Sequence, residues 1–325
     1  MLTREFFRHG WLALALTVCF GATNARAAGP QQSPKEAKVS VYIAMINSES
    51  AHVFNNYAKY TKVITDADKG PTCKELHLQY VVSGMGDSAP ERYEGWKKAL
   101  AKGPKLDVDA AAQEMLAASQ ALYKPENEAS QYYFKSQYRD DACKRGTEFH
   151  AQLMPNWLRF MKAEREIRAF LDKYTDERDA TELTKTEKKY GKGLHYYHNK
   201  LMMDGKALIR LTDKDPLDPT EIRTRLEAFE PVIADAKAVA EKAGKKDKRT
   251  ADAIYQGGYS QLLSRGERFR DALKEMLRVV DEEAKDPKAA QRMPTRRENA
   301  SKNLVGAYNS LVQQSNSTMY SQSMK

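Results

Sequence analysis

The spacing of apolar residues along the chain predicts long amphipathic helices. Between residues 222 and 243 the apolar positions recur at alternating steps of four and three, which places them on one helix face. Asp218-Pro219 precedes this segment and Gly244 follows it, and these residue types favour a helix start and a helix end. A second apolar face runs from 254 to 280 and stops at Asp286-Pro287. We expect the two segments to pack as a hairpin.

The same periodicity occurs elsewhere in the chain, and no segment alternates cleanly enough to predict a strand. Further helices are expected over 42–64, 149–174, 194–211 and 304–311. Turn-forming residues predict breaks at 70–71, 84–90, 103–104, 125, 176–181, 213–219 and 286–294. The sequence therefore predicts an all-α protein, an elongated multi-helix bundle of about eight helices.

The connections between these helices are short, which bears on the number of domains. Linkers of this length cannot isolate domains, so residues 28–315 are expected to form a single helical domain. Two lobes, 36–213 and 219–315, are the alternative division of that domain. Residues 316–325 are expected to be a frayed tail.

The N-terminus has the pattern of a cleavable signal peptide. Arg4 and Arg8 precede an apolar run over 11–20, and Ala25-Arg26-Ala27 is the small-x-small triplet of a cleavage site. The run is too short to cross a bilayer core, and no comparable stretch follows it. Cys19 lies inside the run, which disfavours a lipid anchor. Residues 1–27 thus predict export to the periplasm without a transmembrane helix in the mature chain.

The charge of the chain narrows the expected partners. Loss of three Arg and one Glu with residues 1–27 lowers the formal net charge from +9 to +7. A basic exported protein meets anionic lipid surfaces, cell-wall polymers and envelope proteins, and these are the expected partners instead of nucleic acid. Basic residues gather at 242–249 and 292–297, where we interpret them as solvated loops capable of salt-sensitive surface binding.

Two cysteines remain after signal cleavage, Cys73 and Cys143. In an oxidising compartment an even count favours one disulfide, and two buried thiols are the alternative. A bridge over this length of chain would stabilise the fold by roughly 4 kcal/mol.

The strongest candidate for chemistry is a polar stripe of Asp140, Cys143, Thr147 and His150. These residues would share one face if a helix runs unbroken through them. A reduced Cys143 beside His150 could bind zinc or act as an activated thiolate, which makes a metal-binding protein or a thiol hydrolase the alternative function. The favoured interpretation is structural: Asp140 and Asp141 end or cap a helix, Cys143 is bridged and His150 is a hydrogen-bonded buried side chain.

A second candidate is a metal site on the face shared by His195, His198 and Met202, whose ligand types suit copper or zinc. This site would need a further ligand from another helix. The sequence contains no Gly-rich phosphate loop, Gly-x-Ser-x-Gly elbow, paired CxxC or His-Glu-x-x-His. No catalytic residue is therefore assigned, and no cofactor is expected.

Several motifs occur in an order that resembles a known family. They are Tyr42 and Asn47, the run from Asp68 to Glu75, Tyr132-Tyr133, the run from Tyr138 to Asp141, Gly146, His150, and the run from Asn303 to Asn309. Together they resemble the YiiG-like family of bacterial envelope proteins, a domain family of unknown function. Cys73 and Phe149 depart from the residues expected there, a small residue and Leu.

The resemblance implies an envelope location, a helical fold and no established activity. Many such proteins are lipid-anchored, which is not expected of this chain. The resemblance also implies that the Gly70 to Glu75 turn and the Asp140 to His150 stretch belong to one framework, in which Cys73 pairs with Cys143. We therefore expect a non-enzymatic envelope binding or scaffold protein, with the metal or thiol hydrolase centred on Asp140, Cys143 and His150 as the alternative.

Overall fold

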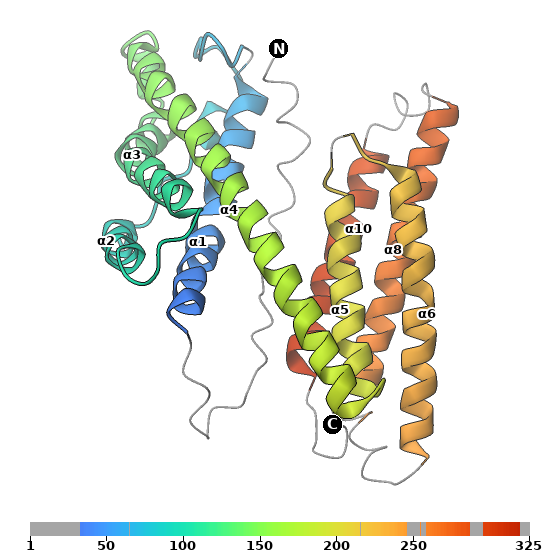
Figure 1. The fold of residues 1–325 in the computed structure, drawn as a ribbon. Coiled ribbons are helices and arrows are strands. Elements are labelled where there is room, and N and C mark those ends of the chain that lie inside the picture. The colour runs from blue at the N-terminus through green and yellow to red at the C-terminus, as the bar shows by residue number, and fades with distance from the viewer. Residues whose placement is uncertain are drawn as a thin grey trace. The chain divides into compact units, whose positions relative to one another are not determined.

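The computed structural model describes residues 33–64, 66–214, 216–245, 254, 258–286 and 295–318. Within these ranges the chain forms eight α-helices and two short 3₁₀ helices and contains no strand (Figure 1). The predicted all-α fold is confirmed. The expected signal peptide at 1–27 lies outside the described residues, and so does the part of the expected tail over 316–325 that begins at residue 319.

The helices fall into two compact units. Unit 1 comprises the described residues up to Lys173, and unit 2 begins at Tyr174. The α-helices are α1 (Pro34–Val63), α2 (Ala89–Leu100), α3 (Asp109–Phe134), α4 (Lys144–Tyr190), α5 (Leu194–Leu211), α6 (Pro219–Gly244), α8 (Tyr259–Lys285) and α10 (Arg296–Ser317). The 3₁₀ helices are η2 (Leu78–Tyr80) and η3 (Gln137–Arg139). The boundary between the units lies within α4, and the single domain over 28–315 stays a prediction.

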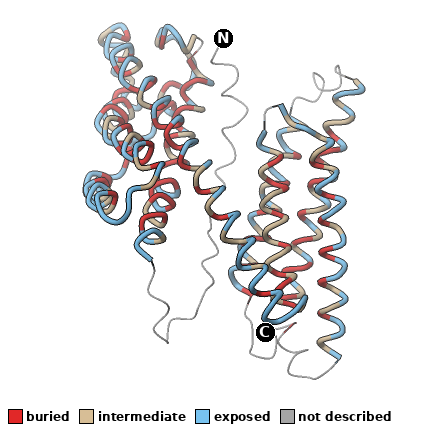
Figure 2. The backbone as a smooth tube through the Cα atoms, in the orientation of Figure 1, coloured by how far each residue is buried: buried red, intermediate tan, exposed pale blue. Residues whose placement is uncertain are grey.

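Unit 1 is built from α1, α2, α3 and the first part of α4. Helix α1 begins with a capping box, in which the Ser33 hydroxyl accepts from the Glu36 amide and the Glu36 carboxylate accepts from the Ser33 amide. Its apolar face is buried, as the tube coloured by burial shows (Figure 2). Tyr57 and Tyr60 on this face pack edge-on against Trp157 of α4, which is itself fully buried.

Buried carboxylates tie the helices of unit 1 together. Glu126 of α3 is fully buried and accepts a hydrogen bond of 2.7 Å from the Trp157 indole nitrogen. Its other oxygen lies 2.7 Å from His52 Nε2 of α1. Glu49 of α1 accepts from the Tyr93 hydroxyl at 2.9 Å, from α2. Because a buried carboxylate is costly without partners, these contacts fix which helix faces meet.

Unit 2 contains a bundle in which each of four helices packs against two others. Helix α5 packs against α6 and α10, and α8 packs against the same two helices. The core includes Phe269, which meets Phe229 edge-on and also contacts the Tyr308 ring. Helix α6 starts as predicted, with the Asp218 carboxylate accepting from the Thr220 and Glu221 amides. The predicted packing of α6 against α8 is confirmed.

Two of the predicted breaks are wrong. Helix α3 continues through Pro125, which is buried, so packing outweighs the backbone hydrogen bond that proline removes. Helix α4 continues through 176–181, where Asp176 accepts from Arg210 at 2.8 Å and lies 3.0 Å from Lys206 of α5. Through these ion pairs the polar residues of that segment stabilise the helix instead of ending it. Neither break could be excluded without the neighbouring helix.

None of the helices within the described ranges has the length and apolar character needed to cross a bilayer.

The packing around Gly205 in α5 generates a stability prediction. A Cβ added there would lie 3.6 Å from the nearest Leu311 atom and 3.8 Å from Phe269 and Tyr308, which is ordinary contact. Gly205→Ala should raise the free energy of unfolding by about 1 kcal/mol, because alanine is the better helix former and the added methyl fits. Urea denaturation measures this change.

Gly266→Ala in α8 is the matched control. Its Cβ would lie 3.3 Å from Leu201, which is tight, so Gly266→Ala should stabilise less than Gly205→Ala or should destabilise. A loss of stability in Gly205→Ala would contradict the packing described for α5.

Candidate functional site

A disulfide joins two turns of unit 1 that are far apart in sequence. Cys73 lies in the turn after α1 and Cys143 directly precedes α4, at a sequence separation of 70 and a Cα–Cα distance of 5.6 Å. This is the pairing expected from the sequence. We call this bridge and the residues packed on it the disulfide junction: Cys73, Cys143, Tyr60, Gly70, Tyr133, Gly146 and His150.

The backbone on both sides of the bridge is in a conformation that side chains disfavour. All non-glycine residues with positive φ in the described chain lie in two segments, 73–77 and 136–143: Cys73, His77, Ser136, Ala142 and Cys143. A left-handed conformation costs such residues of order 1 kcal/mol each, so it persists only where surrounding contacts enforce it. The bridge supplies one such contact to each segment.

Two glycines allow the junction to close. Gly70 has a φ of +88°, and a Cβ on it would lie 2.9 Å from Cγ of His150. Gly146, in the first turn of α4, leaves room for both sulfurs. A Cβ there would lie 2.9 Å from Sγ of Cys143 and 3.3 Å from Sγ of Cys73. A side chain at either position would push the two turns apart.

Aromatic packing completes the junction. The Tyr60 ring stacks on the His150 ring with centroids 5.8 Å apart, and the Tyr60 hydroxyl lies 3.1 Å from His150 Nδ1. Tyr133 is fully buried beside Gly146. Burial raises the pKa values of Tyr60 and Tyr133 well above the ordinary tyrosine value. Burial also lowers the pKa of His150, against an opposing effect of Asp68. All three side chains are therefore uncharged at neutral pH.

Asp141 caps the start of α4. Its carboxylate accepts from the Cys143 amide at 3.0 Å, the Arg145 amide at 3.1 Å and the Tyr132 hydroxyl at 2.8 Å. Although burial alone would raise the pKa of Asp141, these hydrogen bonds lower it. The carboxylate thus stays ionised and satisfies amides at the helix start, as the structural interpretation of this segment expected.

The polar stripe does not form a cluster. Helix α4 begins at Lys144, so Asp140 and Cys143 precede it, and only Thr147 and His150 lie on it. Asp140 and Thr147 are exposed, whereas His150 packs on Tyr60. Cys143 is buried with its sulfur bonded to Cys73. The continuous helix on which the stripe depended is absent because Ala142 and Cys143 have positive φ.

The second candidate, on α5, serves helix packing. His198 is buried, and its Nε2 lies 2.6 Å from the Ser315 hydroxyl of α10. His195 and Met202 are only partly buried. In the portion of the chain that the structure describes, no three His, Cys, Asp or Glu side chains are grouped so as to hold a metal ion.

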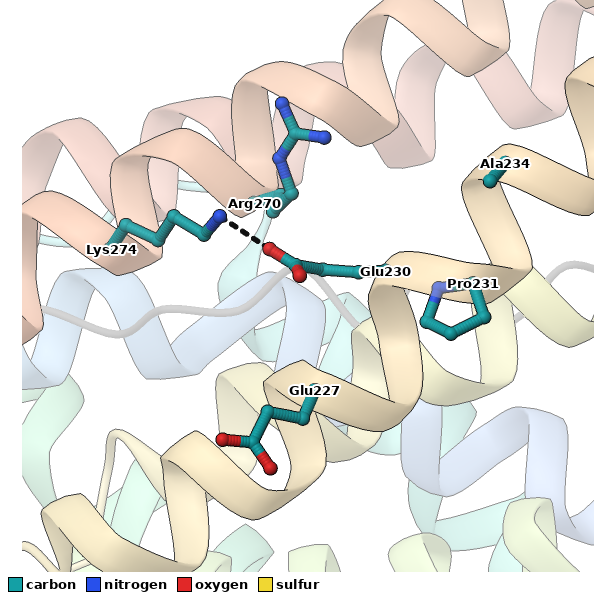
Figure 3. A pocket seen from close by; sticks show the side chains of 6 residues that line it. All are labelled: Glu227, Glu230, Pro231, Ala234, Arg270 and Lys274. Atoms are coloured by element: carbon teal, nitrogen blue, oxygen red, sulfur yellow. Dashed lines mark ion pairs between the residues drawn. The ribbon is translucent and has the colours of Figure 1, made fainter.

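A shallow surface pocket lies in unit 2 between α6 and α8. It is lined by Glu227, Glu230, Pro231, Ala234, Arg270 and Lys274. Figure 3 shows the first four on one helix and the two cations on the other, with an ion pair between Lys274 and Glu230. Both cations of this pocket are already paired, Lys274 with Glu230 and Arg270 with Asp271, so they offer no unpaired positive charge to a ligand.

Three residues of the disulfide junction were not predicted to form a site: Tyr60, Gly70 and Tyr133. Gly70 and Tyr133 occur in the motifs that carry the family resemblance, and Tyr60 lies within the helix expected over 42–64. Their shared location becomes visible only when the disulfide brings α1, α3 and α4 together.

These features define a class of protein: an all-α chain whose first unit is closed by a disulfide between two strained turns. Residues 34–317 match the family described as "Protein of unknown function (DUF3829)", and the chain belongs to this family. It is 30% identical over 216 residues to "Uncharacterized protein YiiG" of Escherichia coli (strain K12). That alignment covers 66% of this chain and 61% of the relative's length. No solved structure matches the chain.

These comparisons confirm the resemblance to the YiiG-like family that the motifs indicated. The family description assigns no activity.

The buried His198 generates a pH prediction. Burial first, and the neighbouring His195 second, lower the pKa of His198 from 6.5 to about 3. Protons therefore bind the unfolded chain more readily, so the His198 contribution to stability is complete above pH 6.5 and is lost as the pH falls toward 3. Between pH 7 and pH 5 this residue should cost about 2 kcal/mol of unfolding free energy.

Urea denaturation at the two pH values measures this effect. Between pH 7 and pH 5, His198→Gln should lose less unfolding free energy than the parent chain. His77→Gln, at an exposed position, should lose as much as the parent chain. An unchanged pH dependence in His198→Gln would refute the assignment.

Proposed function

We propose that the protein is exported to the periplasm and acts there as a non-enzymatic binding or scaffold protein of the bacterial envelope. The observation that carries this proposal is the disulfide junction, because a bridge on which two strained turns depend suits an oxidising compartment. In the reducing cytoplasm the same turns would lose that restraint.

The N-terminal sequence supports the same location. Residues 1–27 combine early arginines, a short apolar run and a small-x-small triplet, which is the order of a signal peptide. The mature charge of +7 that follows from cleavage suits contact with the anionic surfaces of an envelope.

The alternative function, a thiol hydrolase or metal-binding protein centred on Asp140, Cys143 and His150, has less support. It needs Cys143 as a free thiolate, and in the structure its sulfur is bonded to Cys73. It also needs Asp140 to converge with His150, but Asp140 is exposed and His150 packs on Tyr60. We therefore propose no second function.

Fractionation of a bacterium that produces the full chain tests the proposal. Osmotic shock should release the protein, its mass should correspond to a chain that begins at Ala28, and the denatured protein should contain no reactive thiol. Metal analysis of protein purified without chelator should show no stoichiometric metal. As a control, Ala25→Leu/Ala27→Leu should retain the uncleaved N-terminus, because bulky residues block the cleavage site.

Three outcomes would count against the proposal. Recovery in the cytoplasm with residues 1–27 intact would contradict export. A reactive thiol at Cys143 or one bound metal ion per chain would favour the alternative function.

A further inference from the structure

Large apolar side chains are exposed next to the disulfide junction. Within the described ranges five large apolar residues are exposed, and the three most exposed are Leu76 at 79%, Phe134 at 68% and Tyr80 at 64%. The other two, Leu158 and Tyr190, are less than 40% exposed and lie on α4, away from the disulfide in the sequence. Such a concentration is unusual on a surface that faces only water.

These three side chains belong to two segments that the bridge joins, 72–80 and 134–145, which we call the junction surface. Leu76 follows Cys73 by three residues, and Phe134 ends α3 next to the buried Tyr133. Tyr80 lies in η2, which packs against α3. Figure 1 shows the turn after α1 and the turn before α4 at the same end of unit 1.

The two segments that carry the exposed apolar residues also carry cations. Lys74, Lys135, Arg139 and Lys144 are exposed, and none of them makes an ion pair with the rest of the described chain. Arg145 is also exposed and reaches Glu128 at 3.9 Å. The junction surface thus presents five cations against three carboxylates.

Two of the three carboxylates are already engaged by the backbone. Glu75 accepts from the Thr72 amide at 2.8 Å, and Asp141 caps α4. Asp140 alone is exposed without such a bond. The charge available to a partner at this surface is therefore positive.

We propose that the junction surface binds an anionic lipid bilayer, with Leu76, Phe134 and Tyr80 entering the headgroup region and the four unpaired cations meeting lipid phosphates. Aromatic and aliphatic side chains bordered by Lys and Arg match the interfacial zone of a bilayer, where apolar burial and electrostatic attraction add. This inference rests on the proposed function, since an exported protein meets such a surface.

The combination of groups favours lipid over the other anionic partners of an envelope. A charged polymer would engage the cations alone and would leave Leu76 and Phe134 in water. A lipid surface uses both kinds of group at once. The disulfide enters the proposal because it holds the segment that carries Leu76 against the segment that carries Lys144.

Flotation of the oxidised mature protein with lipid vesicles tests the proposal. Vesicles of equal parts phosphatidylcholine and phosphatidylglycerol should carry the protein, and pure phosphatidylcholine vesicles should not. Lys74→Gln/Lys135→Gln/Lys144→Gln should weaken binding on the order of a hundredfold, from a few-fold for each cation near an anionic surface. Binding should also weaken at higher ionic strength.

Leu76→Ser/Phe134→Ser should weaken binding at least tenfold, because both side chains leave water on contact with the bilayer. Matched controls come from exposed residues elsewhere. Lys98→Gln/Lys102→Gln/Lys105→Gln removes three exposed lysines of unit 1, and Leu158→Ser/Tyr190→Ser removes the other exposed apolar residues. Both controls should bind within about twofold of the parent, since surface substitutions away from a site have small effects. Circular dichroism checks that every variant is folded.

The proposal is overturned if the parent chain does not float with anionic vesicles, if it binds neutral vesicles equally well, or if the controls lose as much binding as the junction variants. Loss in the lysine variant with none in the apolar variant would indicate a charged polymer partner and would also overturn it. A failure of the proposed function is separate: a cytoplasmic protein that still binds vesicles contradicts export alone, and a periplasmic protein that does not bind contradicts this inference alone.

Discussion

The disulfide between Cys73 and Cys143 is the constraint on which the described architecture of unit 1 depends. It closes a loop of 70 residues, which in the chain-entropy account removes about 4 kcal/mol of unfolded-state freedom. Three features fit together only when the two turns are held in contact. They are the left-handed residues beside the bridge, the absence of side chains at Gly70 and Gly146, and the stacking of Tyr60 on His150. The buried hydrogen bonds of Glu126 and Glu49 fix which helix faces of unit 1 meet.

This arrangement explains why the family motifs occur where they do in the chain. The run from Asp68 to Glu75 forms one side of the bridge, and the run from Tyr138 to His150 forms the other. Asp141 starts α4, Gly146 admits the sulfurs, and His150 covers Gly70. Asp141, Gly146, His150 and Gly70 therefore have structural roles at the bridge, and the exposed groups beside it remain for contact with a partner.

Much of the fold follows from local signals in the sequence. Asp218 and Pro219 start α6 because a capping carboxylate and a first-turn proline act within a few residues, and the apolar periodicity of α6 and α8 reports directly which faces pack. The breaks predicted at Pro125 and 176–181 are wrong because the interactions that keep those segments helical come from other helices. The polar stripe failed for a related reason, since Ala142 and Cys143 adopt left-handed conformations that no spacing rule anticipates. The exposure of Leu76 and Phe134 likewise depends on tertiary packing.

Hydrogen exchange followed by mass spectrometry, on the oxidised chain and on Cys73→Ser/Cys143→Ser, tests most directly whether the disulfide holds this surface together. Loss of the bridge should speed exchange in segments 72–80 and 134–145, while α5, α6, α8 and α10 keep their protection because their packing does not involve it. Unchanged exchange in the two segments would contradict the account, since other contacts would then hold the strained turns.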